Sequence, residues 1–410
     1  MSAREKTDPW TTDWTNATFS FAERDRRWAK VRRLMVRDGV DLIACLHCTS
    51  NHDRGQADVR YLTQLGENSD EIVAAFPVEG EVMAWRSRPG PCPSSDWLGE
   101  VRAARRGMGA ACISTWLKEN PRFQTGTIAI TGLTSSNLAH IRAAEGEANW
   151  QSVEMLKRSF PSARLVSATP ILGEARWQKS GEEIAFLRKA TEIAEITEQA
   201  LFDHARPGVA ERHVFAHMMF ANADAGGSFA PMLGWVSGPQ GRAYNRIEQP
   251  SLRILQPGDV LAVEIEGRWG GYISQIDMTA AIGSAHPELV EAMKWTRESF
   301  ERTLARMAPG VTMRELIEAA RLAALDGRLK VELGLHGRGT GDDGPLLVAS
   351  RRETDDVLDL PLAEGCCVAV KPSAALDGIG DYCRWGDAVA VTARGAERLG
   401  TRPAELPILT

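Results

Sequence analysis

The sequence predicts an α/β (α+β) protein with two domains, the second of which is built from two related halves. Three observations support this fold class. The chain has 410 residues, which is longer than a single compact core usually grows. Its N-terminal half alternates helical and extended patterns, and its C-terminal half contains an internal repeat. We expect the two domains to span residues 1–172 and 173–410.

Short segments of the N-terminal half carry the patterns of alternating helices and strands. A helix is expected over residues 21–40, and strands are expected over residues 41–46, 71–78, 81–85 and 127–132. The second domain is expected to begin between residues 168 and 180. There a long helix opens at Ser180, with Glu183 at the spacing of a capping box.

The composition gives no sign of disorder and limits the classes of function. Apolar residues make up 43% and charged residues 25%, an ordinary balance for a globular protein. The net charge is −6 and basic residues are scattered, which argues against a nucleic-acid partner. The N-terminal residues lack the apolar segment of a secretory signal, and no stretch is long enough to span a bilayer. Seven cysteines indicate free thiols, so we expect a cytoplasmic protein.

The C-terminal half contains one motif twice. Pro207-Gly208-Val209 recurs as Pro309-Gly310-Val311, and each copy follows a helical segment and precedes a strand pattern. The two strands read PGDVLAVEIEG and AEGCCVAVKPS, and Glu264 in the first corresponds to Lys371 in the second at an offset of 107 (371 − 264). If the two halves fold alike, these two side chains meet near a pseudo-twofold axis.

Five motifs follow one another in the second half of the chain: GWVSGPQGRAYN, PGDVLAVEIEGRWGGYISQIDMT, GLHGRGTG, LAEGCCVAVKP and GDYCRWGDAVAVT. In their order and spacing they resemble the pita-bread family of aminopeptidase P, prolidase and creatinase. The resemblance extends over most of the chain. It implies a creatinase-like N-terminal domain followed by a catalytic-type pita-bread domain with pseudo-twofold symmetry.

Metal-dependent members of this family hold two divalent ions with two Asp, one His and two Glu. The resemblance places those positions at Glu264, Gln275, His336, Lys371 and Gly386. Of these, only the histidine is unchanged, and an amide, an ammonium and a glycine do not supply the anionic oxygens that hard cations need. We therefore expect no paired metals and no other cofactor. A single metal held by Glu266, Asp277 and His336 stays an alternative, because Glu266 and Asp277 keep the family's spacing of eleven (277 − 266).

The altered positions resemble those of the metal-independent members, creatinase and the ectoine hydrolases, which hydrolyse C–N bonds of small charged metabolites. The resemblance implies an amide- or amidine-like bond as the target, with Glu264 as general base or nucleophile. We expect Lys371 to stabilise this carboxylate and a developing oxyanion. His336 would move protons near neutral pH. A purely structural ion pair of Glu264 with Lys371 is the alternative interpretation.

Further residues are expected to bind the substrate: Glu266, Gln275, Asp277, Tyr244, Asn245, Arg338, Trp269, Arg384 and Trp385. Asp277 stands where creatinase binds a guanidinium group. Tyr244 or Asn245 stands where the family's other active-site histidine is found, a departure that argues against creatinase activity itself. Arginines would pair with a substrate carboxylate. The tryptophans would cover a cationic group or else pack in the core.

Two other classes of function stay open. A lyase branch of the same fold resembles a metal enzyme, so metal content separates it from a hydrolase. A catalytically inactive binding protein is the second alternative. Members of the family are commonly dimeric, and the resemblance places residues 47–58 in a loop that reaches the neighbouring active site. We expect a homodimer that acts on a small molecule.

Overall fold

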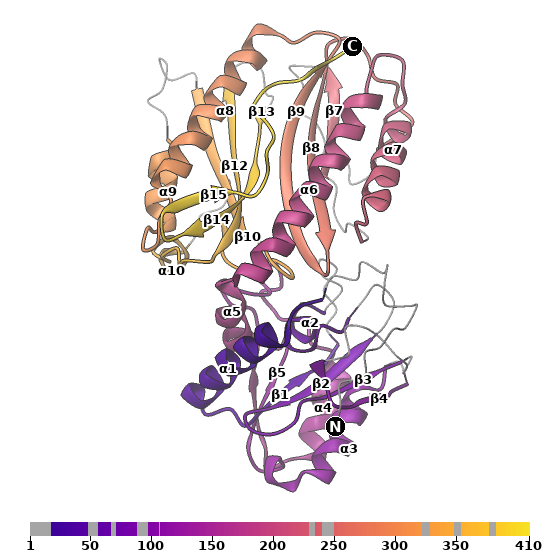
Figure 1. The fold of residues 1–410 in the computed structure, drawn as a ribbon, viewed down its shortest axis with the longest axis vertical. Helices are drawn as coiled ribbons and strands as arrows, with labels where there is room; N and C mark the ends of the chain where they lie inside the picture. Colours follow the sequence, from indigo (N-terminus) through magenta and orange to yellow (C-terminus); the bar gives the residue numbers. More distant parts are fainter. Residues whose placement is uncertain are drawn as a thin grey trace. The chain divides into compact units, whose positions relative to one another are not determined.

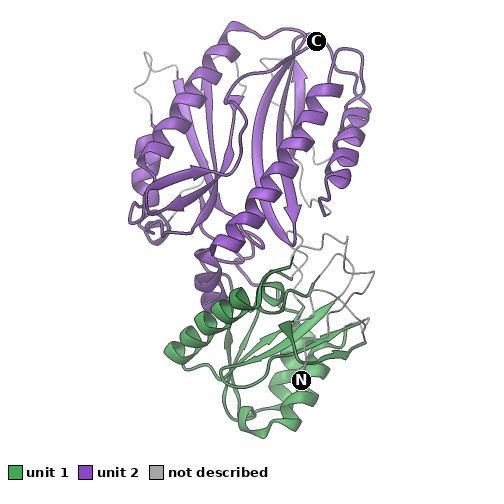
Figure 2. Cartoon of the chain, in the orientation of Figure 1, with its two compact units in different colours: residues 1–49, 54–133, 147–168 green, residues 50–53, 134–146, 169–410 purple. Residues whose placement is uncertain are grey.

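The computed structural model describes residues 18–47, 56–66, 71–87, 97–105, 107–228, 234–239, 250–321, 329–347, 354–376 and 383–410. These residues form two compact units (Figures 1 and 2). Unit 1 takes in the described residues up to Leu133 together with Glu147–Ala168, and unit 2 takes in residues 134–146 and the chain from Thr169 onwards. Unit 1 combines helices with one β-sheet and unit 2 combines helices with two, as the predicted α/β (α+β) fold class requires. No helix in these ranges is long and apolar enough to cross a membrane.

Unit 1 is built on a six-stranded mixed sheet with the order β4-β3-β2-β1-β5-β6. The strands are β1 (Leu42–Cys45), β2 (Ile72–Pro77), β3 (Met83–Arg86), β4 (Val101–Ala103), β5 (Thr127–Ile130) and β6 (Arg164–Ser167). The helices are α1 (Phe21–Asp38), α2 (Ala57–Thr63), α3 (Gly109–Glu119) and α4 (Trp150–Ser159), with a short 3-10 turn at Pro121–Phe123.

The expected helix and the four expected strands of this unit are present as α1, β1, β2, β3 and β5. The sequence did not predict the edge strands β4 and β6. Both are short, and their side chains are half-buried or exposed. They therefore lack the apolar run that identifies a buried strand.

Unit 2 contains two similar halves (Figure 1). The first comprises α6 (Gly181–His204), α7 (Glu211–Asp224), β7 (Gly234–Pro239), β8 (Asp259–Trp269) and β9 (Tyr272–Ile282). The second comprises α8 (Pro287–Arg306), α9 (Met313–Ala320), β10 (Leu329–Gly337), β11 (Leu346–Leu347), α10 (Asp355–Leu358), β12 (Cys367–Leu376), β13 (Cys383–Arg384), β14 (Asp387–Thr392) and β15 (Gly395–Arg398). Helix α5 (Thr169–Trp177) precedes them, and strand β16 (Ile408–Leu409) ends the chain.

Each half of unit 2 supplies one sheet and one long covering helix. The first sheet has the order β16-β9-β8-β7, and α6 packs against β8 and β9. The second has the order β11-β10-β12-β14-β15, with β13 paired to β12, and α8 packs against β12. The two halves thus have the same helix-on-sheet arrangement (Figure 1).

The repeated Pro-Gly-Val motif forms the same turn in both halves. Gly208 and Gly310 have φ angles of +87° and +88°, a left-handed conformation that glycine adopts without steric cost. The N–H of Gly208 donates to the carbonyl of Leu255 at 2.9 Å, and that of Gly310 donates to the carbonyl of Leu362 at 2.8 Å. The internal repeat in the sequence therefore corresponds to a duplicated structural unit.

Helix α6 is capped at its N-terminus and is held against the β8–β9 hairpin. The expected capping box is present: Ser180 Oγ accepts from the Glu183 N–H at 3.1 Å, and a Glu183 carboxylate oxygen accepts from the Ser180 N–H at 2.9 Å. The other Glu183 oxygen accepts from the Tyr272 hydroxyl at 2.7 Å. Gly267 permits close approach, because a Cβ there would lie 1.9 Å from the Ala190 carbonyl oxygen. The hairpin that carries the candidate site is thus fixed against a helix.

Candidate active site

Four polar side chains share one face of the β8–β9 hairpin. In its antiparallel register, Glu264 lies opposite Asp277, and Glu266 lies opposite Gln275. Directly opposed residues share a face, and so do residues two apart along a strand. All four are almost fully buried, with exposed fractions of 6% for Glu264, 0% for Glu266 and 1% for the other two. Three carboxyl groups and one amide therefore meet in the interior of unit 2.

Cationic side chains from the second half face these carboxylates. Lys371 lies in β12, and its Nζ is 3.7 Å from Glu264 Oε1. Arg384 lies in β13, with its Nη1 3.2 Å from the same oxygen and its Nε 3.9 Å from Asp277 Oδ2. The structure thus brings together Glu264 and Lys371, the two residues that the sequence repeat relates by symmetry.

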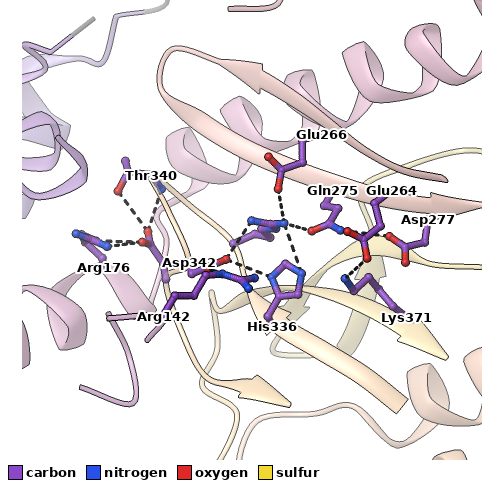
Figure 3. A network of polar contacts seen from close by, with 12 residues as sticks. Arg142, Arg176, Glu264, Glu266, Gln275, Asp277, His336, Thr340, Asp342 and Lys371 are labelled. Carbon is purple, nitrogen blue, oxygen red and sulfur yellow. Dashed lines mark hydrogen bonds and ion pairs between the residues drawn. The ribbon is translucent and has the colours of Figure 1, made fainter. Parts of the chain in front are cut away.

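Arg338 connects the hairpin to the loop that follows β10. Its Nη2 donates to Glu266 Oε1 at 2.7 Å and also to Gln275 Oε1. The Gln275 amide nitrogen in turn donates to Asp277 Oδ1 at 3.3 Å. This orients the amide with its oxygen toward the guanidinium and its nitrogen toward the carboxylate. Figure 3 shows these contacts, with the ion pair of Glu264 and Lys371 beside them.

His336 is the titratable group at the centre of this network. It is 2% exposed, its Nε2 is 3.4 Å from Arg338 Nη2, and its Nδ1 is 3.4 Å from Asp342 Oδ1. Burial lowers the pKa of His336 well below its usual value, and the positive charges of Arg338 and Lys371 act in the same direction against the weaker effect of Asp342. The imidazole is therefore neutral at pH 7, and its surroundings disfavour its protonated form.

Asp277 is a carboxyl group of the site whose ionisation is disfavoured by its surroundings. Burial raises the pKa of Asp277, and the nearby charge of Glu264 adds to this rise. Lys371 is the largest opposing influence, followed by Arg384. The protonation of Asp277 therefore depends on the cations supplied by the second half of the unit.

A second set of buried ion pairs supports the loop after β10, and the sequence analysis did not predict it. Arg142 and Arg338 both pair with Asp342. Asp343 is paired with Arg176 at 2.6 Å and with Lys179 at 3.8 Å. In the sequence, the only local sign of this cluster is that Asp342 and Asp343 are adjacent and directly follow a glycine-rich segment. Apart from Arg338, its partners come from segments 164 to 200 residues away, which no local pattern reveals.

The remaining predicted residues fall into three groups. Trp385 is 2% exposed and packs edge-on against Phe300 with ring centroids 4.8 Å apart, which favours the alternative of core packing. Trp269 is half-buried at the end of β8, where its ring lies beside Gly226. Tyr244, Asn245 and most of the predicted dimer loop (residues 48–55) lie outside the described residues.

The donor set at the five family ligand positions does not fit two divalent ions. The ammonium of Lys371 and the guanidinium of Arg384 occupy the space beside Glu264. Gly386 offers no side chain, and a Cβ there would lie 2.8 Å from Lys371 Cγ. Across the ranges that the structure describes, no group of three or more His, Cys, Asp or Glu side chains is arranged to hold a metal ion. Hard cations require several such oxygens.

The chain matches known proteins in sequence. The family model of Metallopeptidase family M24 matches residues 185–393, just over half of the chain. The uncharacterized hydrolase/peptidase y4tL of Sinorhizobium fredii is 30% identical over 174 residues, which are 41% of this chain and 44% of that protein. The probable dipeptidase PepE of Mycobacterium tuberculosis is 28% identical over 254 residues, 60% of this chain and 64% of that one. The aligned regions thus span less than two thirds of these relatives.

Solved structures resemble the whole chain in fold. The X-Pro aminopeptidase of Thermotoga maritima superposes with a TM-score of 0.74 at 18% identity, covering 93% of this chain and 99% of that one. The Xaa-Pro dipeptidase of Bacillus anthracis superposes with a TM-score of 0.72 at 20% identity, covering 94% and 100%. The pita-bread fold expected from the five motifs is therefore confirmed.

Proposed function

We propose a function from the premise that this chain belongs to metallopeptidase family M24. The protein is a hydrolase that cleaves a C–N bond, amide- or amidine-like, in a small charged metabolite, and it works without the paired metals of the family. Its relatives, an uncharacterized hydrolase/peptidase and a probable dipeptidase, support C–N hydrolysis. One observation carries the metal-independent part: Lys371 Nζ lies 3.7 Å from Glu264 Oε1, and the resemblance assigns both residues to ligand positions of the family.

The charge of the site supports this proposal. Glu264 Oε1 already has two cations within 4 Å, Lys371 and Arg384. A unit-charge pair at this separation attracts by about 4 kcal/mol at an effective dielectric constant of 20. Part of the positive charge that two metal ions would supply is thus provided by side chains, and a further cation would be repelled.

In the proposed reaction, Glu264 takes a proton from an attacking water molecule. In the alternative route, its carboxylate attacks the electrophilic carbon, the C–N bond breaks as the leaving nitrogen takes up a proton, and water then hydrolyses the covalent intermediate to restore Glu264. In the water route, the C–O bond forms as Glu264 accepts the proton. The C–N bond then breaks as that proton reaches the leaving nitrogen, with His336 as the group that moves it. Lys371 stabilises the negative charge that develops on the substrate oxygen or nitrogen. His336 is neutral before this transfer.

The same network supports a charged substrate. Buried carboxylates and buried cations both line the site, and each pairs with the other when no ligand is bound. A small molecule with charges of its own would exchange these internal pairs for external ones, and because the protein groups are already buried, only the charges of the molecule itself would lose their hydration. Glu266, Gln275, Asp277, Arg338 and Arg384 are the described residues that would bind it.

The test combines metal content with turnover. We would measure bound metal in the purified protein, and then assay cyclic amidines, guanidino acids and N-acyl amino acids in the presence of a chelator. Xaa-Pro dipeptides with added Mn²⁺ would serve as the comparison for ordinary family activity. Chelator-resistant turnover that is lost in Glu264→Gln and kept in Arg188→Met is the expected result. Turnover that appears only with added metal would contradict the proposal.

A catalytically inactive binding protein is the second candidate. It is supported by the closed set of internal ion pairs, in which Glu264, Glu266 and Asp342 each have a cationic partner within 3.7 Å. Under this alternative, a compound of the panel raises the melting temperature without being converted.

We also propose that the protein forms a homodimer, and light scattering of the purified protein would check this.

A further inference from the structure

Among the described residues, one isolated β-bridge joins the two sheets of unit 2, between Asp277 and Gly386. The N–H of Asp277 donates to the carbonyl of Gly386 at 3.1 Å, and the N–H of Gly386 donates to the carbonyl of Asp277 at 3.0 Å. The side chain of Asp277 belongs to the candidate site, and Arg384 stands two residues before Gly386. The separation between these opposite charges, 3.9 Å, therefore depends on how this bridge is held.

Arg402 binds both carbonyl groups of the bridge. Its Nη2 donates to the carbonyl oxygen of Gly386, and Nη1 and Nη2 each lie 3.5 Å from that of Asp277. Each carbonyl oxygen has two lone pairs, so Arg402 adds a second hydrogen bond to an acceptor that the bridge uses already. The guanidinium is 7% exposed and lies over the ring of Trp385, 4.6 Å from its centroid.

Glu198 of α6 is the counter-ion of this buried guanidinium. Arg402 Nη1 donates to Glu198 Oε1, and Glu198 is 5% exposed. Around them, three carboxyl groups (Glu195, Glu198 and Asp387) face two guanidinium groups (Arg398 and Arg402). Burial raises the pKa of Glu198 to about 7. The neighbouring negative charges of Glu195 and Asp387 also raise this pKa, whereas the positive charge of Arg402 lowers it. The cluster thus holds Arg402 in place, and it contains one more carboxyl group than guanidinium groups.

The chain around Arg402 crosses from one sheet to the other. The N–H of Leu399 donates to the carbonyl of Ala388 in β14, in the second sheet. Ile408 in β16 pairs with Ala281 of β9, in the first sheet. Arg402 therefore lies where this C-terminal segment passes the junction, and its side chain reaches the one backbone bridge between the two sheets in the described part of the chain.

We propose that Arg402 is a positioning residue: it fixes the Asp277–Gly386 bridge and thereby sets the distance between the hairpin carboxylates and the cations that face them. Its effect on catalysis rests on the proposed function, but its effect on the bridge does not. Lysine cannot replace it fully, since an ammonium lacks the planar fork that reaches two carbonyls and a carboxylate at once.

The test measures amide hydrogen exchange at single-residue resolution in Arg402→Lys and Arg402→Met. We expect the Asp277 and Gly386 amides to exchange about ten- to a hundredfold faster than in the unchanged protein, as for the loss of one or two charge-assisted hydrogen bonds. Amides at the centre of the hairpin, such as those of Ile265 and Ile276, should keep their rates. The matched control is Arg188→Met, which removes an exposed ion pair between α6 and β15 and should leave both bridge amides unchanged.

Two results would overturn the proposal. One is unchanged exchange at the bridge, and the other is an equal acceleration of all amides in unit 2, which would assign Arg402 to global stability. If Arg402→Met does not fold, Arg402→Lys decides by the same measurement. For a substrate found in the chelator assay, we expect Arg402→Lys to lower kcat about tenfold at constant KM. An unaltered kcat would refute positioning, whereas a panel without any substrate would refute only the proposed function.

Discussion

Replacing Lys371 with Met removes the cation at the centre of the candidate site while keeping most of the side-chain volume. The structure gives the size of the effect. Lys371 Nζ is 3.7 Å from Glu264 Oε1, and such a pair is worth about 4 kcal/mol of Coulomb attraction at an effective dielectric constant of 20. Arg384 remains 3.2 Å from the same oxygen, and the Lys371 side chain is 15% exposed. We therefore expect a net loss of about 1–3 kcal/mol in the free energy of unfolding.

The loss should depend on pH through Asp277. Its pKa is raised in the folded protein by burial, and Lys371 is the main influence against that rise. A carboxyl group with a raised pKa stabilises the fold while protonated, and it loses this contribution as the pH rises through its folded pKa. Lys371→Met raises that pKa further. The variant should therefore be closest to the unchanged protein in acid and furthest from it at neutral pH.

Urea unfolding at several pH values measures this effect, and the chelator assay measures turnover in the same variant. Lys371→Met should be folded and inactive, and Lys371→Arg, which keeps the charge, should lose less stability. Arg188→Met is the control for removal of a cation from an exposed ion pair, with an expected change within about 1 kcal/mol. Full activity of Lys371→Met together with unaltered stability would refute the reasoning.

Two further predictions concern α6 and its surroundings. The pKa of Glu198 is about 7 in the folded protein against a usual value of 4.5, so its contribution to stability is complete below pH 4.5 and falls by about 3 kcal/mol as the pH rises past 7. Urea unfolding from pH 5 to 8 should show this fall, and Glu198→Gln should flatten it; a steeper fall in the variant would contradict the assignment. Gly267→Ala should cost about 3 kcal/mol or more, because its Cβ would lie 1.9 Å from the Ala190 carbonyl oxygen. Gly181→Ala, at the first turn of the same helix with open space around it, should instead stabilise by about 0.4–1 kcal/mol in the same denaturation experiment. Equal stabilities of the two glycine variants would show that the helix and hairpin are not packed as described.

Features with a local physical cause followed from the sequence. The strands β1, β2, β3 and β5 are short apolar runs, the capping box of α6 needs only Ser180 and Glu183 at fixed spacing, and the repeated glycine turns need φ above zero. The repeat carried one long-range relation as well. Two halves that fold alike bring symmetric positions together, which is why the meeting of Glu264 with Lys371 was open to prediction.

Contacts between distant segments were decided by the tertiary structure alone. Arg402 reaches Glu198 and Gly386, and Asp343 reaches Arg176, without a local pattern that marks any of them as partners. The protonation of His336 and Asp277 belongs to the same class, since their pKa values are displaced mainly by burial. Burial is a property of the assembled sheets and helices. The sequence by itself thus determined the fold and the central pair of the site, whereas the packed structure determined the charge states and the residues that hold them.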